Sequence, residues 1–486
     1  MDKKTHFGRR GLLRMGGALG SSLALSNTSA QTPERPNILL VLSDDHSVPH
    51  VGCYGNKDIK TPNLDRFAAQ GMRFDRFYVM SPQCAPSRSS IMTGRSPVAT
   101  QMTRFSAPLP MDVGTYPEVL RANGYFTGVA GRTYHLNGEA GKSDPLIQGI
   151  YNKLELRRFP ERLDYVRTGN MRTGIEQFSE FLDLKPKDKP FFMQLGSNDP
   201  HRPFGPNMAR EPHDPAKLKL PSHFPDTPLV REDFGFYYDK ISRFDDDFGT
   251  VMQLLEDRGL AANTLVAFLG DNGAALLQGK GTLHEFGINV PLIMRWPGRI
   301  KPGRTSSELL SAEDLAPTAL EAAGVAVPKV MTGRSFLNHL RGEAFTGRKH
   351  VFAERGAHHI YLPMHTAAFD LSRCVVGRQY KFIYNALWQL PYEPVDFAST
   401  AFWKDLRERN AAGKLSPELS RMYFAPSRPM FELYDLVNDP GEFNNLAGRK
   451  EAAAFEQELR AALVEWMVTE RDFLPLPIAT DPPDLR

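Results

Sequence analysis

The sequence predicts an α/β fold with a large, mainly parallel central sheet flanked by helices, followed by a smaller C-terminal α+β domain with an antiparallel sheet. Its first two thirds contain continuous apolar runs of strand length, which are typical of strands buried on both faces of a parallel sheet. Segments with apolar residues at intervals of three or four separate these runs and predict amphipathic helices. From about Gly333 the pattern changes to strands joined by turns, which favours an antiparallel sheet.

The expected N-terminal domain spans residues 36–340, and its strands are predicted at 37–42, 125–130, 190–195 and 264–269. Its helices are predicted at 62–69, 115–123 and 241–255. The last of these helices carries three consecutive aspartates, Asp245, Asp246 and Asp247. Because consecutive helix positions point in different directions, we interpret these aspartates as a solvated face and not as a metal site.

The expected C-terminal domain spans residues 345–475, with a loose tail at 476–486. A hairpin is predicted at 373–384 and a further strand at 431–436. The domain ends in an amphipathic helix. The apolar face of that helix is formed by Phe455, Leu459, Ala462, Leu463 and Trp466.

The composition of the chain limits the partners that it can have. The 486 residues carry a formal net charge of only +3 and no long basic run, which argues against a nucleic-acid partner. The three cysteines, Cys53, Cys84 and Cys374, are too few for a disulfide framework, although one bridge between Cys53 and Cys374 stays open. Beyond the N-terminus, no stretch approaches the length of a membrane span.

Residues 1–30 are interpreted as a twin-arginine-type signal peptide. The pair Arg9-Arg10 precedes a short, glycine-rich apolar run that ends in the small residues Thr28-Ser29-Ala30, as in cleaved export signals. The alternatives are an amphipathic N-terminal helix and a membrane anchor, but the apolar run is short and interrupted. We therefore expect the twin-arginine export machinery as a partner and a periplasmic or secreted location.

Polar side chains follow each of the four predicted parallel strands where the strand ends. In chain order these residues are Asp44, Asp45, Arg132, His135, Asn198, His201, Asp271 and Asn272. Because ligands bind at the carboxyl ends of the strands in an open parallel sheet, we expect the four groups to converge on one site. The first and last groups offer only oxygen ligands, which predicts a hard cation, Ca²⁺ or Mg²⁺.

A lone cysteine, Cys84, lies in a segment rich in proline and serine at 81–95. Pro86 suits the first position of a helix that continues to Thr93, and Gly94 suits the left-handed residue that ends it. Cys84 would then lie at a helix N-terminus, where unpaired N–H groups favour a developing anion. The alternative is an ordinary buried cysteine.

The residues around this cysteine resemble the signature of the sulfatase family, within the alkaline phosphatase-like superfamily. The matching residues are Cys84, Pro86, Ser87, Arg88, Thr93, Gly94 and Arg95. The resemblance implies that a separate maturation enzyme oxidises Cys84 to formylglycine (3-oxoalanine), whose hydrate is the nucleophile. It also implies that residue 84 binds a metal ion together with the two acid pairs at the strand ends, and it favours Ca²⁺.

Other positions resemble further sulfatase motifs. Arg132 and His135 stand where many members have a lysine and a histidine, and arginine keeps the charge but changes the geometry. By this resemblance, Arg132 would hold an oxygen of formylglycine or of the sulfate, and His135 would contact the hydrated aldehyde or the sulfate. His201, in the run Asp-Pro-His-Arg-Pro, resembles the histidine that protonates the leaving group, with His135 as its rival. Lys280 matches the lysine that binds the sulfate, and His284, where relatives carry tyrosine, would face the substrate. Solvated side chains at these positions are the alternative interpretation.

The C-terminal domain resembles the heparan N-sulfatase (sulfamidase) branch, with iduronate-sulfatase-like members also near. The stretches that carry this resemblance are 354–364, 390–397 and 402–406. Within the first of them, His358 and His359 would contact the sugar, or would belong to a plain loop.

These observations together predict an exported sulfatase that hydrolyses sulfate esters or sulfamates of a sulfated carbohydrate. The main alternative is a phosphoesterase on the same fold, which would normally use threonine or serine as nucleophile. A non-catalytic glycan-binding protein would require an unmodified Cys84. A thiol hydrolase that pairs Cys84 with His135 would leave the acid pairs without a role. The sequence leaves the sugar open, so heparan-type N-sulfate, ulvan and carrageenan all remain candidates.

Overall fold

The central sheet holds the four predicted parallel strands side by side in its middle. The computed structural model describes residues 35–104, 108–132, 134–137, 145–156, 159–358 and 366–476. The eight strands lie in the order β5 (Tyr165–Thr168), β4 (Phe126–Gly131), β6 (Phe191–Gly196), β1 (Asn37–Ser43), β7 (Thr264–Gly270), β8 (Leu292–Arg295), β2 (Met72–Phe74) and β9 (Arg304–Ser306). The first five strands are parallel to one another, whereas β8 is antiparallel to both β7 and β2.

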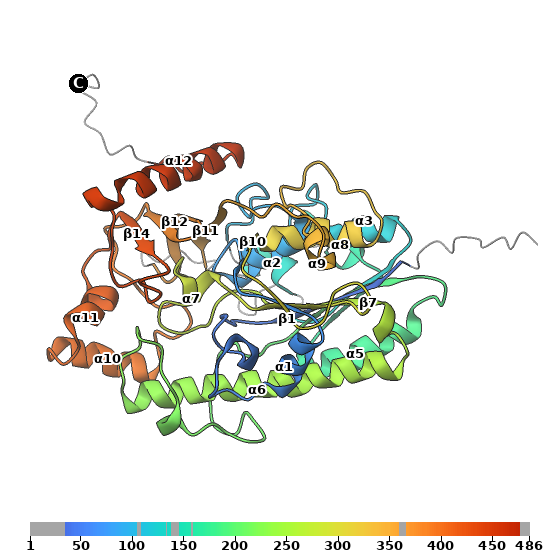
Figure 1. The fold of residues 1–486 in the computed structure, drawn as a ribbon, viewed down its shortest axis with the longest axis horizontal. Helices are drawn as coiled ribbons and strands as arrows, with labels where there is room; N and C mark the ends of the chain where they lie inside the picture. The colour runs from blue at the N-terminus through green and yellow to red at the C-terminus, as the bar shows by residue number, and fades with distance from the viewer. Residues whose placement is uncertain are drawn as a thin grey trace, which may run out of the picture. The chain divides into compact units, whose positions relative to one another are not determined.

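Helices cover both faces of this sheet (Figure 1). One layer contains α1 (Pro62–Ala69), α5 (Met171–Leu184) and α6 (Pro228–Asp257). The other contains α2 (Cys84–Thr93), α3 (Tyr116–Ala122), α8 (Leu315–Ala322) and α9 (Leu337–Arg341). Four other elements belong to this part of the chain: β3 (Phe77–Tyr78), α4 (Pro145–Lys153), α7 (Glu285–Ile288) and β10 (Leu310–Ser311).

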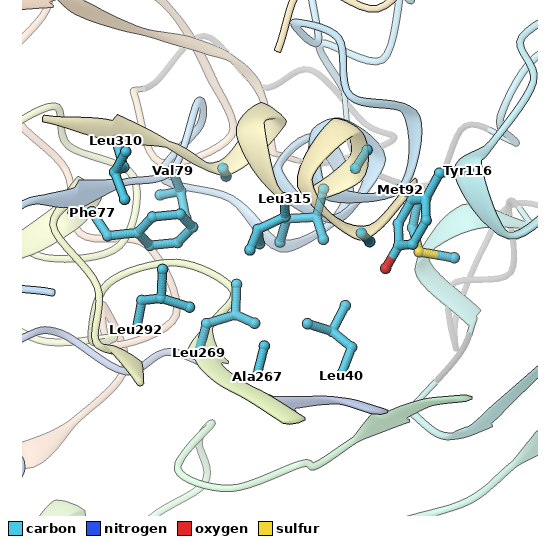
Figure 2. Close-up of a cluster of buried hydrophobic side chains, with 14 of the residues drawn as sticks. Leu40, Phe77, Val79, Met92, Tyr116, Ala267, Leu269, Leu292, Leu310 and Leu315 are labelled. Atoms are coloured by element: carbon cyan, nitrogen blue, oxygen red, sulfur yellow. The ribbon is translucent and has the colours of Figure 1, made fainter. Parts of the chain in front are cut away.

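Alternate residues of the central strands belong to two separate apolar cores, as expected for a sheet that is buried on both faces. Leu39 of β1 and Phe268 of β7 pack with residues of α1, α5 and α6. On the opposite face, Leu40 and Leu269 pack with Met92 of α2 and with residues of α3 and α8. Figure 2 shows this second core between the strands and the helices. The helix that begins with Cys84 is thereby fixed against the sheet.

The C-terminal part forms a four-stranded antiparallel sheet, as predicted. Its order is β11 (Val351–Ala357), β12 (Phe369–Val376), β13 (Tyr380–Asn385) and β14 (Phe431–Asp435), and it is accompanied by α10 (Ala401–Ala411) and α11 (Pro417–Phe424). The last helix, α12 (Ala453–Thr469), packs on the sheet through Leu459, Leu463 and Trp466. Residues from Arg35 onward form one compact unit, so the expected boundary near residue 340 stays a prediction.

Two local predictions need correction. Helix α2 begins at Cys84 and not at Pro86, so Cys84 is the first helical residue and Gln83 is its N-cap. Asp245 is not part of a solvated face: it is fully buried, and its carboxylate accepts hydrogen bonds from the backbone N–H groups of Asn63 and Leu64 at the start of α1. An acid at a helix N-terminus is favourable because unpaired N–H groups are found there.

Several other expectations concern cysteines and termini. The three cysteines are free thiols, so no bridge joins Cys53 to Cys374. Among the residues that the structure describes, no helix is both long enough and apolar enough to cross a membrane. The expected signal peptide at 1–30, and all of the expected tail except residue 476, lie outside the described residues.

The backbone at Gly131, at the end of β4, lies so close to a neighbouring strand that even an alanine there should greatly lower the stability of the fold. Gly131 has a φ of +72°, and a Cβ at this position would lie 2.1 Å from the carbonyl oxygen of Gly196. Gly131→Ala is therefore expected to lower the free energy of unfolding by about 3 kcal/mol or more. The matched control is Gly259→Ala, where φ is +65° but no atom lies within 4 Å. There we expect a loss of only about 1 kcal/mol, the cost of the backbone conformation. Urea unfolding measures both, and equal losses would contradict this account.

Candidate active site

The carboxyl ends of β4, β6, β1 and β7 bring the predicted polar groups together. The backbone N–H of Asp44, just after β1, donates to the carbonyl oxygen of Asp199 at 2.9 Å. On the other side, the N–H of Asp271, just after β7, donates to the carbonyl oxygen of Ser43 at 3.0 Å. The second bond continues the ladder of the sheet one residue past β7, and the first ties the loop after β6 to the end of β1. The side chains that follow therefore start from fixed positions.

Three aspartates and one cysteine form the centre of the site. Asp44, Asp45, Asp271 and Cys84 are fully buried, and each offers a ligand atom within 4.8 Å of those of the others. The N–H of Asp45 donates to Oδ1 of Asp271 at 3.0 Å, and the hydroxyl of Tyr237 in α6 donates to the carbonyl oxygen of Asp45 at 3.0 Å. Asp45 has a φ of 66°, a conformation that aspartate adopts more readily than most residues. This backbone turn directs Asp45 into the cluster.

The burial of these carboxylates affects their ionisation. Burial, reinforced by the charge of Asp44, raises the pKa of Asp271 to about 6. The pKa of Asp45 is raised to about 6 as well, because burial outweighs the opposing charge of Lys280. Asp44 differs: burial raises its pKa, but the charges of Arg132, His201 and Arg88 hold it well below the ordinary value. Both shifts are caused first by burial, so the charged forms of Asp45 and Asp271 are costly at this place unless a positive group lies beside them.

The residues present fit a hard cation. The side chain of Asn272 is fully buried, and its Nδ2 donates to Oδ1 of Asp45 at 2.8 Å and to the carbonyl oxygen of Gly273 at 2.9 Å. Its Oδ1 is also buried and has no hydrogen-bond partner among the residues that the structure describes. An unpartnered buried oxygen next to three carboxylates matches the oxygen ligand set of Ca²⁺ or Mg²⁺.

Cys84 lies at the first position of α2, where the helix dipole favours negative charge. The residue is 0 % exposed, and its Sγ lies 3.5 Å from Oδ1 of Asp44 and 3.9 Å from Oδ1 of Asp45. Burial and the charge of Asp44 raise the pKa of the thiol well above its ordinary value. A thiol nucleophile needs the opposite shift, because the thiolate is the reactive form. Without a cation beside it, the encoded thiol is therefore poorly suited to attack by itself.

Two arginines connect the acids. Nη2 of Arg88 lies 3.0 Å from Oδ2 of Asp44, and its Nε lies 2.8 Å from Oδ2 of Asp271. Its Nη1 donates to the carbonyl oxygen of Arg132 at 3.0 Å. Nε of Arg132 in turn lies 2.7 Å from Oδ2 of Asp44. Arg88 thereby ties the ends of β1, β4 and β7 to α2, and both guanidinium groups lie beside the cluster.

The two histidines predicted from the sequence differ in exposure. His135 is buried, and its Nε2 lies 3.5 Å from Nη2 of Arg132. Burial and the charges of Arg88 and Arg132 hold the pKa of His135 well below its ordinary value. The side chain of His201 is 22 % exposed, and its Nε2 lies 3.8 Å from Oδ2 of Asp45. Burial and the charge of Lys280 lower the pKa of His201 to about 4.

The sequence did not indicate the residues that hold the loop of His201. Both Nε and Nη2 of Arg243 in α6 donate to the carboxylate of Asp199 at 2.7 Å. Nζ of Lys240, also in α6, lies 3.2 Å from the same carboxylate and donates to the carbonyl oxygen of His201. The helical pattern of α6 does not indicate that Lys240 and Arg243 bind this loop. Their contacts arise only because α6 packs against the loop in the folded protein.

Lys280 is buried between two carboxylates. Its Nζ lies 2.9 Å from Oδ1 of Asp45 and 2.7 Å from Oδ2 of Asp396. Burial lowers the pKa of Lys280, but the charges of Asp396 and Asp45 outweigh this effect and raise it well above the ordinary value. Lys280 is therefore a fixed cation. Asp396 comes from the C-terminal part of the chain, and the sequence interpretation assigned no role to it.

The remaining predicted substrate residues lie in different surroundings. Nδ1 of His284 lies 3.5 Å from Glu442, and its Nε2 lies 3.9 Å from Glu432. These contacts direct His284 toward the C-terminal sheet, so its expected contact with the substrate stays a prediction. Nε2 of His358 lies 3.4 Å from Oδ1 of Asp396, next to the acid that binds Lys280. His359 lies outside the described residues.

Comparisons with known proteins agree with this arrangement. The model of the family described as "Sulfatase" matches residues 36–325, and the model described as "N-sulphoglucosamine sulphohydrolase, C-terminal" matches residues 276–397. An ulvan-active sulfatase of Formosa agariphila is 29% identical over 472 residues, which cover 94% of this chain and 85% of the relative. The human N-sulphoglucosamine sulphohydrolase is 28% identical, with 90% of each chain covered.

A solved structure shows the same fold. It is that of a protein in complex with its substrate D-glucosamine-2-N,6-O-disulfate, with a TM-score of 0.66, 22% identity, and coverage of 91% of this chain and 99% of that one. The family model covers more than half of the chain and includes the segments that carry Asp44, Cys84, His201 and Asp271. The chain therefore belongs to the sulfatase family, whose members hydrolyse sulfate esters or sulfamates.

Proposed function

We propose that this protein is an exported sulfatase that removes sulfate from a sulfated saccharide, with formylglycine at position 84 and a divalent cation, Ca²⁺ or else Mg²⁺. The observation that carries the proposal is the position of Cys84. It is the first residue of α2, within reach of three buried aspartates, and Arg88 of the same helix binds two of them. An inert structural cysteine would have no need of these charges.

Two groups that the structure does not contain would complete this chemistry. A bound Ca²⁺, held by Asp44, Asp45, Asp271, Asn272 and residue 84, would supply Lewis acidity and neutralise the acids. The formylglycine hydrate would supply the attacking hydroxyl, together with a second hydroxyl that allows sulfate to leave. The maturation enzyme, the twin-arginine export machinery and a periplasmic or secreted location belong to the same proposal.

The charged side chains of the chain itself would bind the sulfuryl group. Lys280 keeps its proton, because two carboxylates contact it. Arg132 and Arg88 have fixed guanidinium groups beside Cys84. Such cations stabilise the charge that develops on the sulfuryl oxygens in the transition state, and their fixed positions avoid reorganisation during the reaction.

His201 is proposed as the group that protonates the leaving oxygen or nitrogen. It lines an open cavity of about 540 Å³, whereas His135 is fully enclosed. Its Nδ1 contacts the carbonyl oxygen of Arg202, which fixes the ring so that Nε2 faces the centre of the site. A bound anionic sulfate would raise the pKa of His201 and favour the protonated form.

Replacement of His201 by asparagine is expected to lower kcat for a sulfated saccharide by about 10²- to 10⁴-fold, the usual contribution of a general acid. The loss should be smaller for an aryl sulfate, if the enzyme accepts one, because a phenolate needs less help from a proton to leave. His223→Asn is the control, since His223 is buried against the rings of Phe224 and of Phe286 in α7. A His201 variant with unchanged kcat would move the acid role to His135.

The names of the relatives support a polysaccharide or glycosaminoglycan substrate. One relative is named for ulvan and another for N-sulphoglucosamine, and the structural neighbour binds a disulfated glucosamine. The experiment is a panel of defined N- and O-sulfated saccharides, with release of inorganic sulfate as the readout. We expect release from at least one member. Faster release of phosphate from matched phosphate monoesters would instead identify a phosphoesterase.

A further inference from the structure

Next to the cluster of Asp44, Asp45, Asp271 and Cys84 lies a cavity of about 540 Å³. The sequence assigned no role to this cavity. His201 and Asp396 line it, and they contact Asp45 and Lys280 of the site. Its walls include Phe204 and Phe402, and the guanidinium carbon of Arg202 lies 3.9 Å from the centre of the Phe204 ring. The cavity therefore combines apolar rings with a few polar groups, which is typical of sites for small ligands.

Asp396 is the point at which the polar groups of this cavity converge. Its carboxylate lies 2.7 Å from Nζ of Lys280, 3.6 Å from Nε2 of His201 and 3.4 Å from Nε2 of His358. Its side chain is 26 % exposed, so it also faces the open cavity. The φ of Asp396 is 66°, and a non-glycine residue in this conformation is often found where function requires it.

The segment around Asp396 is held in place from both sides. Gly281, next to Lys280, has a φ of +83°, and a Cβ there would lie 2.4 Å from Cγ2 of Val395. The ring of Phe397 stacks on that of Phe402 with centroids 5.4 Å apart. The N–H of Glu393 donates to Oγ1 of Thr366 at 2.8 Å. The carboxylate of Asp396 is thus presented by packed neighbours on a defined backbone.

A second metal site does not explain this arrangement. Asp45, His201 and Asp396 do offer ligand atoms within 4.8 Å of one another. However, Nζ of Lys280 already lies 2.9 Å from Asp45 and 2.7 Å from Asp396. The ammonium group therefore supplies the positive charge between these two acids, and a metal ion there would be repelled by it.

A carboxylate beside a sulfate-binding lysine presents an electrostatic problem. An incoming sulfate is an anion, and a second anion close to it weakens its binding. Asp396 is held in its ionised form by the ammonium group of Lys280, whose Nζ lies 2.7 Å from its carboxylate. An ionised carboxylate can only accept hydrogen bonds. Apart from its contacts with Lys280 and His358, Asp396 therefore favours a ligand that brings a hydrogen-bond donor to it.

We infer that Asp396 is a specificity-determining residue, which accepts a hydrogen bond from a hydroxyl or amine group of the sugar next to the sulfate that is removed. The inference rests on the proposed function and names the part of the substrate that the cavity beside His201 recognises. A sugar ring in this cavity would lie against the aromatic wall, with its O–H or N–H donor toward Asp396 and its sulfate toward Lys280. A saccharide with an anionic group at that position would be rejected.

The rival explanation is that Asp396 only positions Lys280. In that case its loss would disturb the sulfate pocket itself, and the binding of any sulfate would weaken. If Asp396 instead contacts the sugar, its removal would leave the affinity for inorganic sulfate unchanged or would increase it, since a nearby negative charge is lost.

The test uses Asp396→Asn and Asp396→Ser in the mature protein. The saccharide with the fastest sulfate release in the panel is the substrate, and inorganic sulfate is the second probe, followed through the rise in melting temperature that it produces. We expect kcat/KM for the saccharide to fall roughly 10- to 100-fold, as for the loss of a hydrogen bond to a charged group. The dissociation constant of sulfate should stay within about threefold or decrease.

Deoxy analogues of the substrate identify the donor. The analogue that lacks the group bound by Asp396 should lose activity with the wild-type enzyme but show little further loss with Asp396→Asn, because the two changes remove one interaction. Glu393→Gln is the matched control, because Glu393 lies on the same segment but lines a different cavity. This substitution should change neither kcat/KM for the saccharide nor the dissociation constant of sulfate.

If the Asp396 variants bind inorganic sulfate more weakly and also show a lower kcat/KM for the saccharide, the inference is overturned in favour of a positioning role. Unchanged kcat/KM in both variants, or additive losses for every deoxy analogue, would overturn it as well. A wild-type protein that releases sulfate from no saccharide would instead contradict the proposed function, and the inference would fail with it.

Discussion

Cys84→Ala is expected to abolish sulfate release, with a fall in kcat of at least about 10⁴-fold, while the protein stays folded. The expected loss is large because the residue carries the nucleophile, and the remaining binding groups cannot replace it. The structural cost should be small, since the substitution removes one buried sulfur atom at the start of a helix, and we expect about 1 kcal/mol. Sulfate release and urea unfolding measure the two effects.

Cys374→Ala provides the matched control for this prediction. Cys374 is equally buried, but it lies in β12 of the C-terminal sheet. Its loss should cost similar stability without a large change in kcat. Sulfate release by Cys84→Ala at the wild-type rate would show that residue 84 is not the nucleophile.

Asp271→Asn is expected to remove the metal and the activity together. Asp271 is buried against Asp45 and Arg88, and asparagine keeps its shape but not its charge. Addition of Ca²⁺ should stabilise the wild-type protein by about 2.7 kcal/mol at 100 times Kd, and the variant by far less. Without metal the variant should be about as stable as the wild type, because burial and Asp44 raise the pKa of Asp271 to about 6, and this makes its charge costly.

The melting temperature with and without Ca²⁺ gives a readout that is independent of catalysis. Asp246→Asn is the control, because Asp246 is exposed on α6 and should leave the calcium response unchanged. Full activity after removal of divalent ions with a chelator would contradict the metal assignment.

The convergence of Asp44, Asp45 and Asp271 could be predicted from the sequence because its geometry follows from local rules. An apolar run predicts a buried strand, parallel strands end at the same edge, and the next residues must lie there. The positions of Asp44 and Asp271 one residue after β1 and β7 agree with this reasoning. The antiparallel C-terminal sheet could be predicted for a similar reason, since its hairpin is a local structure.

Asp396 could not be predicted in the same way. It lies between elements, and it reaches Lys280 only because the C-terminal part packs against the loop at Gly281. The sequence offered one indication, the resemblance of residues 390–397 to the sulfamidase branch. That resemblance points to the segment as a whole and assigns no role to any of its side chains. Contacts between distant segments depend on packing, which a periodic pattern does not encode.

His284 and Asp245 illustrate the same limit. The motif around His284 indicates a loop near the site, but the direction of the side chain follows from Glu442 and Glu432, which are distant in sequence. The sequence pattern makes Asp245 one of three solvated acids. In the structure, backbone N–H groups at the start of α1 donate hydrogen bonds to its carboxylate. In both cases the direction and contacts of the side chain depend on residues that are distant in sequence, and the local sequence does not indicate which residues these are.

The most direct test of the account is the mass of the proteolytic peptide that contains residue 84, taken from preparations whose sulfate release is measured in parallel. We predict a peptide in which an aldehyde replaces the thiol side chain, and its fraction should rise in proportion to the specific activity across preparations. An active preparation in which residue 84 is entirely the unmodified thiol would contradict the account.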